Sequence, residues 1–106
     1  MLGVALLATT AAGSLAGSWT ANIMSNQSYS GTAVVPSTAV DPAYTQSMAV
    51  YLGQTICDGP AGDWSKSYPA SPDDEYVDNV PCSPGSYPVY LYQTGSGYAS
   101  VDFNWM

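Results

Sequence analysis

Few residues in this chain of 106 can do chemistry: two cysteines, eight acidic residues, one lysine and no histidine. Without histidine there is no Ser–His or Cys–His pair to activate a nucleophile, and zinc loses its commonest nitrogen ligand. The glycine motifs that bind phosphates and dinucleotides are absent as well. Paired carboxylates hydrolyse glycosides only within a cleft, which requires a larger scaffold. The sequence therefore predicts a protein that is not an enzyme.

The two cysteines lie in turn-like sequence. Cys57 begins the stretch CDGP, and Cys82 lies within VPCSP. In a chain with the composition of an exported protein, this context predicts a Cys57–Cys82 disulfide. The bridge would close a loop of about 25 residues and stabilise the fold by roughly 3–4 kcal/mol. The alternative is a pair of free, buried thiols.

The acidic residues Asp73, Asp74, Glu75 and Asp78 form a short cluster. Carboxylate oxygens are the ligands that Ca²⁺ prefers, so these four residues are the candidate calcium ligands, and no other cofactor is predicted. Their spacing differs from that of an EF-hand loop, and the alternative is a solvated acidic loop. A second candidate site is Asn26, because Asn26-Gln27-Ser28 fits the pattern for N-glycosylation. Such triplets also occur by chance on polar strand surfaces.

The charge balance excludes one class of partner. The net charge is −7, and Lys66 is the single basic residue. Nucleic acid binding needs several basic side chains to neutralise phosphates, so a nucleic acid partner is excluded, and an anionic membrane surface is repelled. Charged residues make up 8% of the chain, against about 25% in an ordinary soluble domain. Nine tyrosines and three tryptophans suit half-buried surfaces, which favours an extracytoplasmic location at a cell surface, outside the cell or in a virion.

The N-terminal residues read MLGVALLATTAAGSLAG and carry no charge. Either they are a secretory signal that is removed, or they form a retained apolar helix over residues 1–18. The many small residues favour a helix that packs against other helices or in a membrane, and the absence of a basic residue argues against a signal. Residues 19–106 are then expected to form a small β-rich domain.

Five strands are expected in that domain, and they are 19–24, 29–35, 47–55, 88–93 and 98–105. The last two read as a hairpin with a glycine-rich turn. In the second strand Val101, Phe103 and Trp105 alternate with polar residues and should be buried. In the first, Tyr90 and Tyr92 oppose Val89 and Leu91 and are the candidate assembly contacts. Prolines and acidic residues between 57 and 88 predict a long irregular region.

The fold class expected from the sequence is α+β, mainly β: an N-terminal apolar helix followed by a small antiparallel β-domain with one disulfide-closed loop. The expected function is a structural subunit of an extracytoplasmic assembly, such as a filament, an envelope or a virion. Its partners would be copies of itself or other subunits, with a membrane as a further candidate. Two alternatives stay open: an accessory subunit of a membrane complex anchored by its helix, and a secreted binding or adhesion module with a cleaved signal. The plan resembles that of type IV pilin-like subunits, but Ala5 stands where these typically carry a glutamate, so the chain is not assigned to that family.

Overall fold

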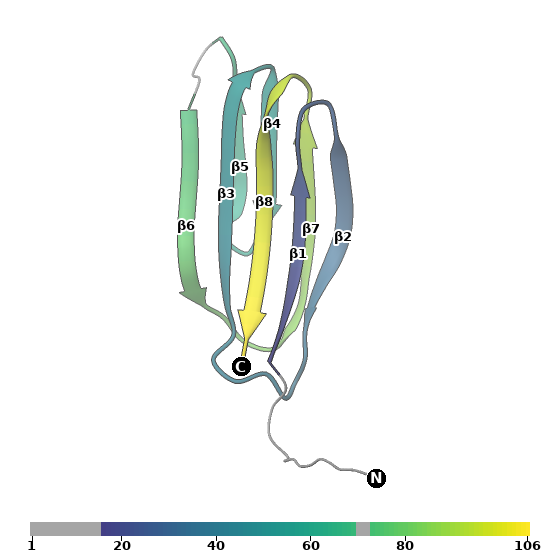
Figure 1. Ribbon diagram of the computed structural model, residues 1–106, viewed down its shortest axis with the longest axis vertical. Coiled ribbons are helices and arrows are strands. Elements are labelled where there is room, and N and C mark those ends of the chain that lie inside the picture. The colour runs from purple at the N-terminus through teal and green to yellow at the C-terminus, as the bar shows by residue number, and fades with distance from the viewer. Residues whose placement is uncertain (1–15, 70–72) are drawn as a thin grey trace.

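The computed structural model describes residues 16–69 and 73–106, apart from the side chain of Asp73. Every regular element in this part of the chain is a β-strand (Figure 1). The strands are β1 (Gly17–Ile23), β2 (Ser28–Val35), β3 (Ala43–Leu52), β4 (Gln54–Gly59), β5 (Gly62–Ser67), β6 (Asp73–Pro81), β7 (Gly85–Gln93) and β8 (Ser96–Trp105).

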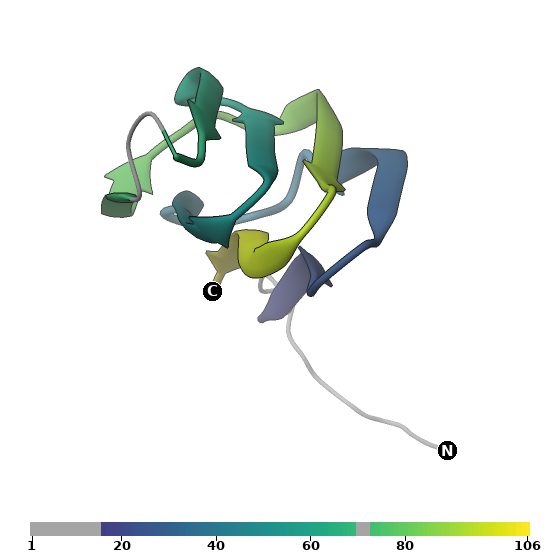
Figure 2. The same ribbon diagram turned by 90° about the horizontal axis from the view of Figure 1, so that it is seen from above.

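These strands form two antiparallel sheets of four strands each. One sheet has the order β1-β8-β3-β6 and is called sheet A; the other has the order β2-β7-β4-β5 and is called sheet B. Apart from β4 and β5, each pair of consecutive strands is divided between the two sheets. Seen from above, the strands surround a shared interior (Figure 2). This strand order is that of an eight-stranded jelly roll, in which two Greek keys close around one core.

The core between the sheets is built by alternation along the strands. The expected burial of Val101 and Phe103 is confirmed, since both have no exposed surface, and Trp105 is half-buried. Val89 and Leu91 are buried as well and face them from the other sheet. Three further aromatic rings surround Phe103, with centroids 5.2 to 6.0 Å from its own; they belong to Trp19, Tyr44 and Tyr87. Aromatic packing therefore joins sheet A to sheet B at this level.

Two buried polar side chains also lie in the core and were not expected from the sequence. Gln46 and Gln93 are almost completely buried. The Gln46 amide donates to Cys57 Sγ at 3.6 Å and its oxygen accepts from the backbone N–H of Ala61, which links β3 to β4 and to the turn that follows β4. The Gln93 amide donates to Thr55 Oγ1, and its oxygen accepts from the N–H of Gly95 at 2.7 Å. Because both amides have partners, their burial does not carry the cost of an unpaired polar group.

The expected α+β class with an N-terminal helix is wrong for the described residues, which form an all-β fold. Gly17 and Ser18, placed in the helix, begin strand β1 instead. The reason lies in the period of the sequence from Gly17 on: Trp19, Ala21 and Ile23 point inward and alternate with exposed polar residues, and the strand pairs along its whole length with β8. The rest of that helix, residues 1–15, lies outside the described residues. No helix able to span a membrane occurs in the described part of the chain.

The predicted disulfide is also wrong, because Cys57 and Cys82 are both free. Cys57 lies in the middle of β4 and points inward to Gln46 of β3. The backbone N–H of Cys82 donates to the carbonyl of Pro42 at 2.9 Å, which places Cys82 beyond the start of β3. Four residues of extended chain, about 13 Å, separate Pro42 from Gln46. Disulfides need Cα atoms within about 7 Å of each other, so the two thiols lie too far apart.

Two further expectations fail in the second half of the chain. The expected hairpin of the last two strands is absent, because β7 belongs to sheet B and β8 to sheet A. The expected irregular region instead holds strands β5 and β6. Three of its prolines lie at the ends of strands: Pro60 follows β4, Pro69 follows β5, and Pro81 ends β6. Proline is tolerated at such positions because no ladder hydrogen bond is lost there.

Candidate interaction edge

Each sheet has two outer strands, and together they form two lateral edges of the sandwich. One edge consists of β1 from sheet A and β2 from sheet B, seen at the right of Figure 1. The other consists of β6 from sheet A and β5 from sheet B. An outer strand presents backbone N–H and C=O groups that have no partner in its own sheet, and these groups can pair with a strand of another chain.

The edge of β5 and β6 is charged. Strand β6 carries three acidic residues and begins at a fourth, Asp73, and β5 carries Asp63 and Lys66. The Lys66 ammonium lies 3.6 Å from the Glu75 carboxylate and so connects the two strands. Charged side chains on an outer strand oppose pairing with another chain, because pairing would remove them from water. This edge is therefore protected.

The edge of β1 and β2 carries no such protection. Its strands read GSWTANI and SYSGTAVV, seven and eight residues without a single charge or proline. Each strand pairs with one neighbour, β1 with β8 and β2 with β7. A long outer strand without charge, proline or bulge is the kind that accepts a further strand.

An aromatic pair lies between the two strands of this edge. Trp19 of β1 and Tyr29 of β2 contact edge to face, with centroids 6.0 Å apart. The Tyr29 ring lies over Gly31, where a Cβ atom would meet the tyrosine hydroxyl. Gly31 thus makes room for the ring, and Tyr29 keeps 36% of its surface exposed. The edge therefore offers another chain an aromatic surface as well as free backbone groups.

The outer face of β2 and β7 continues this uncharged surface. Its eight outward side chains contain no charge; they are Ser28, Ser30, Thr32, Val34, Ser86, Pro88, Tyr90 and Tyr92. The two candidate assembly contacts, Tyr90 and Tyr92, stack with centroids 6.3 Å apart and planes inclined by 11°. Tyr90 is 41% exposed and pairs in register with Ser30 of β2. The structure thus places both tyrosines beside the uncharged edge, a relation that the sequence did not reveal.

The four candidate calcium ligands lie along strand β6, and the structure describes the side chains of Asp74, Glu75 and Asp78. The side chain of Asp73 is outside the described residues, and neighbouring residues of a strand point to opposite faces. Glu75 contacts Lys66, whereas Asp78 accepts a hydrogen bond from Thr45 Oγ1 at 2.8 Å. Within the described residues, no three potential metal ligands come together. The calcium site remains a prediction without a built pocket.

Neither cysteine is set up as a nucleophile. Burial raises the pKa of the Cys57 thiol to about 11, although the hydrogen bond from Gln46 lowers it in part. Burial also raises the pKa of Cys82, against a hydrogen bond with Tyr87. A reactive cysteine needs a lowered pKa, because the thiolate is the attacking species. Both thiols are therefore protonated at neutral pH.

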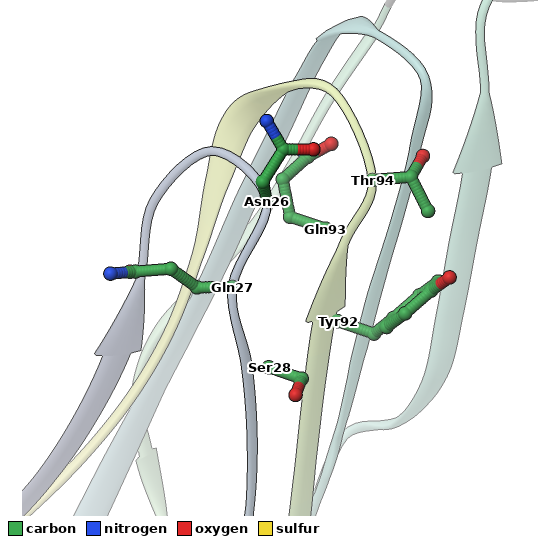
Figure 3. Close-up of a pocket in the computed structure, with 6 residues that line it drawn as sticks. All are labelled: Asn26, Gln27, Ser28, Tyr92, Gln93 and Thr94. Atoms are coloured by element: carbon green, nitrogen blue, oxygen red, sulfur yellow. The ribbon is translucent and has the colours of Figure 1, made fainter.

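A small pocket lies at one end of the sandwich, next to the uncharged edge (Figure 3). Its volume is about 280 Å³. The turn between β1 and β2 and the beginning of β2 contribute Asn26, Gln27 and Ser28; the end of β7 and the following turn contribute Tyr92, Gln93 and Thr94. The glycosylation candidate Asn26 is thus exposed at a turn, with a φ angle of 58°.

Comparison of the chain with models of protein families, with curated proteins and with solved structures gives no match in any of the three. Jelly rolls serve many unrelated functions, so the fold by itself selects none of them. The function is therefore proposed from the edges, faces and pocket described above.

Proposed function

We propose that this protein is a structural subunit of an extracytoplasmic assembly and that it joins a second copy of itself through the edge of β1 and β2. The observation that carries the proposal is the contrast between the two edges. One is charged along both strands, and the other has fifteen strand residues, seven and eight, without a charge. An unprotected edge of this length is a liability in a monomer and an interface in an assembly.

A second copy suits this edge because of the charge distribution. Two chains of net charge −7 repel each other, so they can approach only where neither presents an acidic residue. The edge of β1 and β2 and the adjoining outer face of β7 form such a surface. Two β2 strands related by a two-fold axis would pair antiparallel, and the two copies of sheet B would become one continuous sheet of eight strands.

The extracytoplasmic location rests on composition, since the free cysteines remove the disulfide as a reason for it. Low charge and high tyrosine content still favour an exported protein. The apolar N-terminal residues precede β1 in the sequence, so a retained apolar segment would be joined to the domain through a strand of the uncharged edge. The mass of the mature chain separates a retained segment from a cleaved signal.

The test is a matched pair of substitutions on the two outer strands of sheet B. Ser30 of β2 and Ser65 of β5 are both exposed, and neither packs in the core. Ser30→Lys places a charge on the unprotected edge, and Ser65→Lys places the same charge on the protected one. We expect sedimentation velocity to show association of the wild type and of Ser65→Lys, and a monomer for Ser30→Lys. Equal association of the two variants, or a wild type that stays monomeric at all concentrations, would refute the proposal.

A further inference from the structure

The pocket at the end of the sandwich is lined without a single charged residue. Its six residues comprise three with carboxamides, Asn26, Gln27 and Gln93, and three with hydroxyls, Ser28, Tyr92 and Thr94. Amides and hydroxyls both donate and accept hydrogen bonds, whereas phosphate and carboxylate ligands require basic partners. The lining therefore suits a neutral ligand that has many hydroxyl groups.

Three of the lining residues, Gln27, Gln93 and Thr94, make hydrogen bonds that hold the walls of the pocket in place. The Gln27 oxygen accepts from the backbone N–H of Met24 at 2.8 Å, and the Gln27 carbonyl accepts from the N–H of Gln93 at 2.9 Å. The Thr94 hydroxyl accepts from the N–H of Gln54 at 2.8 Å. These bonds fix the turn between β1 and β2 against the end of β7. Because the walls of the pocket are already ordered, binding a ligand costs less conformational entropy.

The other polar side chains have no partner within the described part of the chain. They are the Asn26 amide, the Ser28 hydroxyl and the Tyr92 hydroxyl, which come from both sides of the pocket (Figure 3). The Tyr92 ring is half-buried and is supported from behind by its stacking on Tyr90. A rigid aromatic ring beside free amide and hydroxyl groups matches a pyranose, whose C–H face packs on the ring while its hydroxyls bond to the polar groups.

We propose that this pocket binds one residue of a neutral glycan. Its volume of about 280 Å³ is at the lower end for ligand sites and suits a single sugar unit. The glycan proposal does not rest on the proposed self-association, although Ser28 and Tyr92 belong to both surfaces, and Ser30→Lys, which lies outside the pocket, separates the two.

The test is saturation-transfer NMR on the full chain, made in a host without N-glycosylation, with the methyl glycosides of glucose, galactose, mannose and N-acetylglucosamine. Glucuronic acid serves as the anionic comparison. We expect transfer to at least one neutral sugar and none to glucuronic acid. Asn26→Gly keeps the positive φ angle at the turn and should weaken binding about tenfold, the effect of one lost hydrogen bond.

Two controls keep the outcome specific. Tyr92→Ser should abolish binding, whereas Tyr76→Ser, an exposed tyrosine on β6 of sheet A, should leave it unchanged. Thermal melts establish that each variant is folded, and Ser30→Lys should still bind sugar even if it no longer associates. Absence of transfer to all four neutral sugars would overturn the proposal. A glycan attached to Asn26 in the native chain would overturn it too, because that glycan would cover the pocket.

Discussion

The two lateral edges of this sandwich are built from the same kind of element and differ in charge. Strands β5 and β6 carry Asp63, Lys66 and the acidic residues of β6, and a Lys66–Glu75 ion pair spans them. Strands β1 and β2 carry no charge, and the Trp19–Tyr29 contact joins them. The comparison shows that most charges of this chain lie on one outer edge, where they oppose pairing, and that none lies on the outer strands where we infer that pairing occurs.

The largest expected effect comes from the core that supports both edges. Phe103 is fully buried and contacts Trp19 of the uncharged edge. Phe103→Ala should lower the free energy of unfolding by about 3–5 kcal/mol, the usual cost of truncating a buried aromatic residue. Chemical denaturation measures the loss, and Asp102→Asn on the outer face of the same strand should change it by less than about 0.5 kcal/mol. A loss of similar size in the two variants would mean that Phe103 does not hold the sheets together.

The next effect is a loss of stability at alkaline pH that comes from the core between the two edges. The pKa of Cys57 is raised from 9.0 to about 11 in the folded chain. Between these values the unfolded chain loses the thiol proton while the folded chain keeps it, so stability falls as the pH rises. The fall should amount to at most about 2–3 kcal/mol. Urea denaturation at several pH values measures it. In Cys57→Ala the free energy of unfolding should fall less steeply as the pH rises. If the free energy of unfolding depends on pH equally in the wild type and in Cys57→Ala, the Cys57 thiol is in contact with water.

The smallest expected effect on stability concerns two tyrosines, one beside each edge, and their effects on self-association distinguish the two edges. Tyr90 lies on the outer face beside the uncharged edge, and Tyr76 lies on the charged strand β6. Replacing either by serine should change the free energy of unfolding by less than about 0.5 kcal/mol, because both are exposed. Tyr90→Ser should weaken self-association, since exposed tyrosines are typical of interfaces, and Tyr76→Ser should not. If Tyr90→Ser unfolds, that tyrosine belongs to the core; if it associates normally, this face is not a contact.

Part of the fold could be predicted from the sequence. The strands expected at 19–24, 29–35 and 98–105 correspond to β1, β2 and β8, and the alternation in the last one identified the buried face that includes Val101 and Phe103, because a period of two is a local property. Strands β5 and β6 were missed because prolines and acidic residues resemble a loop. In fact Pro60, Pro69 and Pro81 lie at strand ends, and the charges belong to the outer strands β5 and β6.

The pairing of the strands, the state of the cysteines and the uncharged edge depend on contacts between residues far apart in the sequence. A short glycine-rich turn after β7 looks the same whether the next strand pairs with β7 or crosses to the other sheet. The free state of Cys57 follows from its inward position in β4, about four residues along β3 from the level of Cys82. The uncharged edge became visible only with the strand order, which places β1 and β2 together at the outside.

The central claim is that β2 pairs with a second copy, and hydrogen–deuterium exchange tests it most directly. Exchange of the backbone amides is followed by mass spectrometry at low and high protein concentration. The account predicts that amides of β2 exchange more slowly at high concentration, that those of β5 do not change, and that Ser30→Lys removes the difference. Concentration-dependent protection in β5 or β6, or none in β2 while the protein associates, would contradict it.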